Sequence, residues 1–372
     1  MHFRPRLSTA ALLLGCAILA DASPAVAATL VVANKAEATV SLIDLDSGKV
    51  VATLPTGRGP HEVGISADGT RALVTNYGQR GAPGSSLTLI DVPRAEVIGT
   101  IELGDYRKPH GVVWLADGHH ALVTVEDAQA LLEVDVDTGR VTAAIDTGQE
   151  VSHMLALGDG RAFVANIGSG SVTVIDLDKG ERVANVSTGD GAEGVAVAAG
   201  GRQVWITNRA ADTVTVLDAA SLEVLASFES KGFPIRATAT AGGEVLVTRA
   251  SAGDMMVYDT AELGKGRRVA FDLKASGFEG RLFGDRFGDS SVPIGVVVDG
   301  EGERAWVAHA NADVITEVDV ESGAILRLLT AGKEPDGMGY SPRTVAPSDT
   351  DTGSSSPDHR QQTPQPIIGS SP

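Results

Sequence analysis

The stretch TVSLIDLDSGKVVATLPTGRGPHEVGISADGTRALVTN, residues 39–76, decides the fold. It contains four short runs that are typical of β-strands, at 39–45, 50–54, 61–66 and 72–76, and each run is ended by Gly, Pro, Asp or Asn. No run is long enough to bury a face alone. Because the same unit recurs up to residue 342, the sequence predicts a repeat architecture of the propeller or solenoid type.

The second strand of each unit gives seven aligned copies. These are LVVAN ending at Asn34, LVTN at Asn76, LVTV at Val125, FVAN at Asn166, WITN at Asn208, LVTR at Arg249 and WVAH at His309. Most copies are 41 or 42 residues apart, and the two longer spacings mark insertions at 77–85 and 273–292. Seven units of four strands predict an all-β, seven-bladed β-propeller that forms one domain over residues 28–342.

The ends of the repeat array predict how the ring closes. The array begins in the middle of a unit, at ATLVVAN, and its last segment, PDGMGYSP at 335–342, is the strand that the first unit lacks. We therefore expect the strand at 335–342 to pair with the N-terminal strands at 28–54. Such pairing joins both ends of the chain in one blade and hides their free edges.

The N-terminus has the pattern of an export signal. Arg4 and Arg6 precede an apolar run at 10–20 and the small-residue segment ASPAVA. This predicts a signal peptide at 1–27 that is cleaved after Ala27, a periplasmic or secreted protein, and no transmembrane segment in the mature chain. Lipidation at Cys16, the only cysteine, is the alternative, because LLGC is similar to a lipobox. Residues 343–372 are rich in Ser, Pro and Gln and predict a disordered tail.

The charge of the chain restricts its partners. The chain has 48 acidic and 30 basic residues, a formal net charge of −18, and only 4% aromatic residues. Nucleic acid and anionic membranes are therefore not expected as partners, because both are bound through clustered Lys and Arg side chains.

The repeats are similar to those of a known family. The succession of VTN or VAN, TVSLID or SVTVID, SGKVVATLPTG and PHEVGISADG resembles the YVTN family of β-propeller repeats. The resemblance implies an exported propeller and leaves the ligand open. More remotely, the family is similar to the propellers of nitrous-oxide reductase, of the haem d1 domain of nitrite reductase (cytochrome d1-type propellers) and of certain lactonases.

Polar residues open the innermost strands, which begin around the mouth of the central channel in this fold. The candidate ligand-binding residues are His61, Glu62, His110, His153, Glu193, Arg236 and Asp336. The three histidines come from consecutive blades and could hold Zn²⁺ or Cu²⁺. Aligned on the apolar run that follows, however, His153 stands one residue later than the other two, so strand alternation predicts that it points to the other face. His309, which replaces a strand-end Asn, is a weaker candidate.

These residues leave more than one function open. The leading interpretation is a binding scaffold without enzymatic activity. It would present the channel mouth and the loop at 273–292 to a small polar ligand or to a periplasmic or extracellular protein. The alternative is a metal- or cofactor-assisted enzyme or redox accessory factor, lactonase-like or cytochrome d1-like, that uses the channel-mouth histidines. An architectural envelope protein is a third possibility. Catalytic residues are not assigned, because no nucleophile elbow, phosphate loop, CxxCH or HExxH motif occurs.

Overall fold

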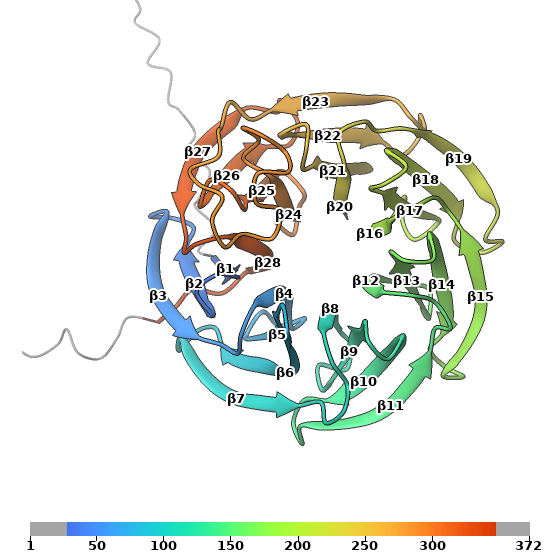
Figure 1. Ribbon diagram of the computed structural model, residues 1–372, viewed down its shortest axis with the longest axis horizontal. Helices are drawn as coiled ribbons and strands as arrows, with labels where there is room; N and C mark the ends of the chain where they lie inside the picture. Colours follow the sequence, from blue (N-terminus) through green and yellow to red (C-terminus); the bar gives the residue numbers. More distant parts are fainter. Residues whose placement is uncertain (1–27, 347–372) are drawn as a thin grey trace, which may run out of the picture.

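The structure is a ring of seven sheets with four strands each, which confirms the predicted seven-bladed β-propeller (Figure 1). It is a computed structural model and describes residues 28–346. The signal peptide predicted at 1–27, with Cys16, and residues 347–372 of the predicted tail lie outside the described residues. Within 28–346, no helix is long and apolar enough to cross a membrane.

Each blade contributes one strand to each of four concentric layers. The innermost strands are β4 (Pro60–Ile65), β8 (Pro109–Trp114), β12 (Ser152–Gly158), β16 (Ala192–Ala198), β20 (Pro234–Ala239), β24 (Pro293–Val298) and β28 (Pro335–Ser341). The second strands are β1 (Thr29–Asn34), β5 (Arg71–Gln79), β9 (His120–Val125), β13 (Arg161–Asn166), β17 (Gln203–Asn208), β21 (Glu244–Arg249) and β25 (Arg304–His309). The third strands are β2 (Thr39–Asp44), β6 (Ala82–Asp91), β10 (Ala130–Asp135), β14 (Ser171–Asp176), β18 (Thr213–Asp218), β22 (Asp254–Asp259) and β26 (Val314–Asp319). The outer strands are β3 (Lys49–Pro55), β7 (Glu96–Glu102), β11 (Arg140–Asp146), β15 (Glu181–Ser187), β19 (Val224–Glu229), β23 (Gly266–Ala270) and β27 (Ile325–Thr330).

One blade joins the two ends of the described chain. Six sheets contain consecutive strands, whereas the seventh has the order β28-β1-β2-β3. In this sheet β28 pairs antiparallel with β1, and Met338 lies opposite Val32. Figure 1 shows β28 between β24 and β4 at the channel. The ring closure expected from the sequence is therefore present.

The core lies between blades rather than within them. Every residue of β1 is buried, while the outer strand β3 alternates between exposed and half-buried residues. One apolar cluster joins Ile43 of the closing blade to Trp306 and Ile315 of the preceding blade. Because each blade buries its faces only against its two neighbours, closing the ring leaves no blade with an uncovered face.

The Asn that ends several second strands has a structural role. The side-chain nitrogen of Asn76 donates to the hydroxyls of Ser86, at 3.0 Å, and Thr88, at 3.1 Å, and its oxygen accepts from the backbone N–H of Gly57 at 3.0 Å. A side chain at position 57 would collide with Asn76, because an added Cβ would lie 2.5 Å from its Cγ. The Asn therefore connects two strands of its blade to the loop that leads into that blade.

His309 takes the place of this Asn in the last blade. Its Nδ1 lies 2.9 Å from the Ser291 hydroxyl, and its Nε2 lies 3.1 Å from the Thr316 hydroxyl. The ring is fully buried, and this burial lowers its pKa to about 3. His309 is therefore a neutral structural residue and does not face the channel mouth.

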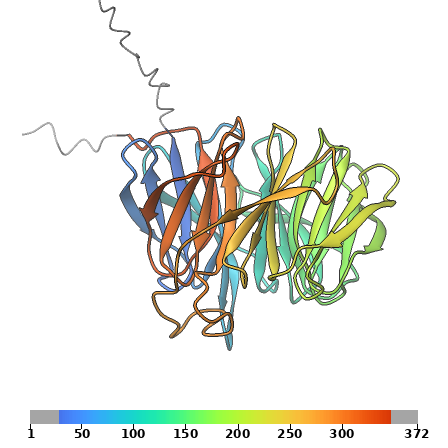
Figure 2. The same cartoon turned by 90° about the horizontal axis from the view of Figure 1, so that it is seen from above.

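Two insertions project from one face of the ring, as Figure 2 shows from the side. One is the tip of the β5–β6 hairpin, and the other is the loop between β23 and β24. The second loop is held to the ring by Arg281, whose Nη1 lies 2.6 Å from an Asp313 oxygen, and by the Leu282 N–H, which donates to the Glu334 carboxylate. Both insertions therefore lie on the face where the innermost strands begin.

Ring closure predicts the effect of two truncations. Residues 343–346 continue from β28 onto the next blade, where the N–H of Ala346 donates to the Pro93 carbonyl at 2.6 Å. A chain that ends at Glu334 lacks β28, so we expect it to lose cooperative urea unfolding monitored by circular dichroism. A chain that ends at Ala346 keeps every described contact and should unfold like the full chain. Equal unfolding of the two would contradict the closure.

The buried imidazole of His309 predicts a specific pH dependence. Its folded pKa of about 3 lies below the ordinary value of 6.5, so the unfolded chain takes up the proton first as the pH falls. The stability that neutral His309 contributes is therefore present above pH 6.5 and lost between pH 6.5 and 3, by up to about 1.4 kcal/mol per pH unit. His309→Asn should fold and show a shallower loss of unfolding free energy in urea titrations over this range. Parallel pH profiles would exclude the assignment.

Candidate functional site

The channel mouth is formed by the second residue of every innermost strand. These residues are His61, His110, His153, Glu193, Ile235, Ile294 and Asp336. The residue before each innermost strand has a positive φ, including the β-branched Val151 at 59° and Val292 at 56°. Left-handed backbone at a β-branched residue costs on the order of 1–3 kcal/mol and persists only where the surrounding structure holds it. The start of each innermost strand is thus fixed by the fold.

The register predicted for His153 from the apolar run is wrong. The ladder pairs Pro60, Pro109 and Ser152 with the last core residues of their second strands, so His61, His110 and His153 occupy equivalent positions. The apolar run misplaced His153 because it begins one residue earlier in this strand, with Met154 at the position that Glu62 and Gly111 occupy. All three histidines consequently point into the same channel.

Threonines of the second strands hold the opening of these strands in place. The Thr75 hydroxyl accepts from the N–H of Glu62 at 3.0 Å and donates to the carbonyl of His110, in the next blade, at 2.9 Å. Thr124 accepts likewise from Gly111 at 2.8 Å and donates to the carbonyl of His153. One hydroxyl therefore fixes two neighbouring blades relative to each other at the mouth.

The three imidazoles form a compact, buried cluster. The Nε2 atoms of His61 and His110 are 3.0 Å apart, and the ring centroids of His110 and His153 are 3.3 Å apart. The exposed fractions of the three residues are 5%, 0% and 6%. Burial, together with neighbouring cationic or imidazole groups, lowers the pKa of each ring well below 6.5. The cluster is therefore neutral at physiological pH and presents nitrogen lone pairs.

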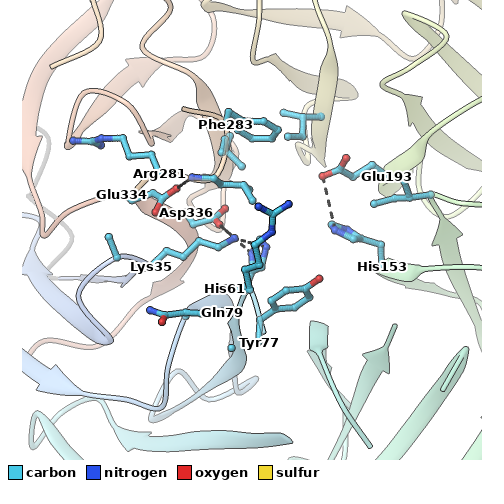
Figure 3. Close-up of a pocket in the computed structure, with 18 of the residues that line it drawn as sticks. Lys35, His61, Tyr77, Gln79, His153, Glu193, Arg281, Phe283, Glu334 and Asp336 are labelled. Atoms are coloured by element: carbon cyan, nitrogen blue, oxygen red, sulfur yellow. Dashed lines mark hydrogen bonds and ion pairs between the residues drawn. The ribbon is translucent and has the colours of Figure 1, made fainter. Parts of the chain in front are cut away.

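His61 is engaged by a lysine and a carboxylate. Lys35 Nζ donates to His61 Nε2 at 2.7 Å and to Asp336 Oδ2 at 3.0 Å, as Figure 3 shows. His61 Nδ1 lies 3.1 Å from the same Asp336 oxygen. Lys35 follows the last residue of β1 and Asp336 lies on β28, so this contact exists only because the ring is closed.

Arg236 crosses the channel between two carboxylates. Its Nη2 lies 2.7 Å from Glu62 Oε1, and its Nη1 lies 2.6 Å from Glu193 Oε1, while Arg209 pairs with the other Glu193 oxygen. Burial raises the pKa of Glu62 to about 7, although Arg236 acts in the opposite direction. Burial alone would lower the pKa of Arg236, but Glu62, Glu193 and Asp336 raise it, so the guanidinium stays charged.

Glu126 and Tyr77 complete the site and were not predicted from the sequence. The Tyr77 hydroxyl donates to Glu126 Oε2 at 2.6 Å, and the other Glu126 oxygen lies 3.6 Å from His153 Nε2. Burial raises the pKa of Glu126 to about 7 and also raises that of Tyr77. The missed mouth residues share one position in the repeat: each directly follows the last residue of the repeated second-strand motif. They are Lys35, Tyr77, Glu126 and Arg209.

These residues form the floor of a cavity of about 910 Å³. Its wall includes Arg80 of the β5–β6 tip and Arg281, Phe283 and Arg286 of the loop between β23 and β24. Phe283 packs on Phe233, with ring centroids 5.9 Å apart. All seven residues proposed from the sequence lie at this mouth, and each has a polar contact with another of the seven. His110 packs beneath the cavity against both other histidines.

The crossing ion pairs predict a stability effect. Arg236→Met leaves the Glu62 carboxylate buried without its cation, and breaking a buried pair in this way typically costs about 3–5 kcal/mol. We expect a loss of this order in the urea unfolding free energy at pH 8. Arg236→Met combined with Glu62→Gln should recover part of it, because the Glu62 charge is then removed and the remaining carboxylate, Glu193, keeps its contact with Arg209. Equal losses in the single and double variants would rule out the pairing.

Comparison with solved structures finds the same architecture. A functionally unknown protein from Desulfotomaculum acetoxidans has a TM-score of 0.68 at 12% identity and covers 86% of this chain and 99% of its own. Hydrazine synthase of Kuenenia stuttgartiensis has a TM-score of 0.58 at 17% identity, covering 71% of this chain and 77% of its own. At these identities the likeness extends to the fold alone.

Comparison of sequences places the chain in a family. It is 24% identical over 177 residues to protein NirF of Stutzerimonas stutzeri and 25% identical over 183 residues to protein NirF of Pseudomonas aeruginosa. The matches cover 45% and 47% of both partners, so the chain spans slightly less than half the length of these relatives. The family model of YNCE-like beta-propellers matches residues 16–122 and 115–241, which together are more than half of the 372 residues. The chain belongs to the YNCE-like beta-propeller family.

Proposed function

We propose that this protein is an exported binding scaffold that holds a small anionic ligand in the cavity at its channel mouth. The supporting observation is the distribution of charge around a cavity of about 910 Å³. Ligand pockets of small molecules have volumes of this order. Export, with cleavage after Ala27, is part of the proposal and is supported by the arginines, the apolar run and the small residues in sequence 1–27.

The floor of the cavity largely neutralises its own charges. Lys35 is paired with Asp336, and Arg236 with Glu62 and Glu193. Satisfying buried charges inside the protein leaves them little free energy to gain from a charged ligand. The ligand charge is therefore determined by the wall rather than by the floor.

The wall carries cations that are not paired. Within residues 28–346, neither Arg80 nor Arg286 lies within 4.0 Å of a carboxylate oxygen, whereas Arg281 is paired with Asp313. Arg286 lies over the rings of Phe233 and Phe287, at 5.0 and 5.2 Å from their centroids. Guanidinium groups bind carboxylate and phosphate through paired N–H donors. The net charge of −18 opposes anions only over a screening length of about 8 Å at physiological ionic strength.

A redox accessory factor or a metal- or cofactor-assisted enzyme is the second candidate function. It is favoured by the neutral imidazole cluster in the floor, which offers nitrogen ligands. It is also favoured by the resemblance of the repeats to those of nitrous-oxide reductase and cytochrome d1 propellers. Visible absorption of the purified protein tests the haem- or copper-containing form of this second candidate, because a scaffold for colourless anions has no chromophore.

Anion binding can be tested by thermal shift on protein treated with a chelator. Succinate and inorganic phosphate should raise Tm at low ionic strength, and the stronger of the two identifies the preferred anionic group. The effect should disappear in Arg80→Gln/Arg286→Gln.

The matched control is Arg140→Gln, at an exposed position at the start of β11 on the opposite face. This variant should respond like the unmodified chain, and glucose should produce no shift in any variant. An equal anion response in the Arg80/Arg286 and Arg140 variants would refute binding at this cavity.

A further inference from the structure

We propose that His110, His153 and Glu126 form a binding site for a divalent transition-metal ion, most suitably Zn²⁺. One nitrogen of each ring and one oxygen of the carboxylate all lie within 4.8 Å of one another. Small shifts of the side chains would bring them to the bond lengths of about 2.0–2.2 Å that Zn²⁺ requires from such ligands. Two imidazoles and one carboxylate are a ligand set that suits this ion.

The polar atoms of this group are not satisfied by the protein. Nδ1 of His110 and Nδ1 of His153 are buried without a hydrogen-bond partner. His153 Nε2 is 3.6 Å from Glu126 Oε1 and 4.0 Å from Glu193 Oε1, beyond hydrogen-bond distance in both cases. Buried polar atoms are nearly always paired, so unpaired nitrogens in a group whose ligand atoms lie within 4.8 Å of one another indicate a missing ligand.

His61 differs from the other two histidines because its Nε2 is bound by a cationic side chain. Lys35 donates to this atom at 2.7 Å and carries a positive charge, which would repel a metal ion at the same nitrogen. A second cluster of three possible ligands, His61, Glu62 and His110, also exists. Its carboxylate is bound by Arg236 through two nitrogens, at 2.7 and 3.2 Å. The proposed metal site therefore replaces His61, which the sequence analysis included with the other two histidines, by Glu126.

Contacts around the proposed ligands hold them in place. Tyr77 donates to Glu126 Oε2, which orients the carboxylate and leaves Oε1 toward His153. Thr124 bonds the carbonyl of His153 and the N–H of Gly111, next to His110. Hydrogen bonds of this kind orient metal ligands, and removing one commonly weakens metal binding about 10–100-fold.

The site opens onto the cavity. Glu126 and His153 both line it, while His110 lies beneath them. Three protein ligands leave one position of a tetrahedral Zn²⁺ ion free, which is the arrangement of catalytic rather than structural zinc sites. A water molecule or an oxygen of a cavity ligand would take this position. The proposal does not rest on anion binding, because it concerns the metal alone.

The experiment is a calorimetric titration with Zn²⁺ alone, on chelator-treated, dialysed protein made without a histidine tag. We expect one Zn²⁺ per chain. Glu126→Gln and His153→Gln should abolish this binding, and Tyr77→Phe should weaken it at least about tenfold. Visible absorption of the Co²⁺-loaded protein gives a second readout, since four-coordinate Co²⁺ absorbs strongly and the Glu126 variant should lack this band.

Two controls separate this site from its neighbours. His61→Gln should retain Zn²⁺, and so should His119→Gln/His120→Gln, which removes the exposed His119 beside Asp137 and the half-buried His120 beside Asp117 on the opposite face. Circular dichroism establishes whether each variant is folded. If a ligand variant does not fold, Tyr77→Phe still tests the site, because it removes no metal ligand. Absence of stoichiometric Zn²⁺ would overturn the proposal. Loss of binding in His61→Gln or in the surface variant, with retention in Glu126→Gln, would also overturn it.

Discussion

The antiparallel pairing of β28 with β1 is the interaction on which the rest of the structure depends. It supplies the innermost strand of the first blade from the other end of the repeat array. The same pairing places Asp336 of β28 beside Lys35 at the end of β1, and both contact His61 of the next blade. Closing the ring therefore covers the last hydrophobic face and also builds one side of the channel mouth.

The mouth combines a floor made by the innermost strands with a wall made by the two insertions. Positive-φ residues before the innermost strands and threonine hydroxyls between blades fix the floor, so its imidazoles and carboxylates have little freedom to move apart. Most of the floor charges are paired with each other, but His110, His153 and Glu126 keep open ligand atoms. The wall is formed by the two insertions, which interrupt the repeat and carry the unpaired arginines. The repeat thus provides the ring and the polar residues of the floor, and the insertions add the arginines of the wall.

The fold could be predicted from the sequence because the same four-strand unit recurs seven times. Second strands such as those ending at Asn76 and Asn208 repeat with nearly constant spacing, and each mismatch in the spacing locates an insertion. The missing strand of the first unit and the surplus strand at 335–342 together require the observed closure. Burial between blades explains why short strands suffice.

The site could be predicted only in part, for physical reasons that involve particular residues. The ring geometry brings His61 and His110 together, as their shared register suggests, but Met154 lengthens the apolar run of β12 by one residue and so concealed the equivalence of His153. Tyr77 and Glu126 meet only because residues beyond the second-strand ends turn toward the channel. The position is marked in each unit by the strand-end motif before it, but a single unit does not show that its side chain reaches the channel.

An engineered disulfide measures the closure itself. Thr29 and Ser341 lie opposite each other in the β1–β28 ladder, and directly opposed residues in antiparallel strands are about 4.5–5.5 Å apart at Cα, within the range that a disulfide spans. In a chain with Cys16→Ser, mass spectrometry of Thr29→Cys/Ser341→Cys after mild oxidation should find the intramolecular disulfide in nearly all folded molecules. Two free thiols in the folded, oxidised protein would contradict the closed ring.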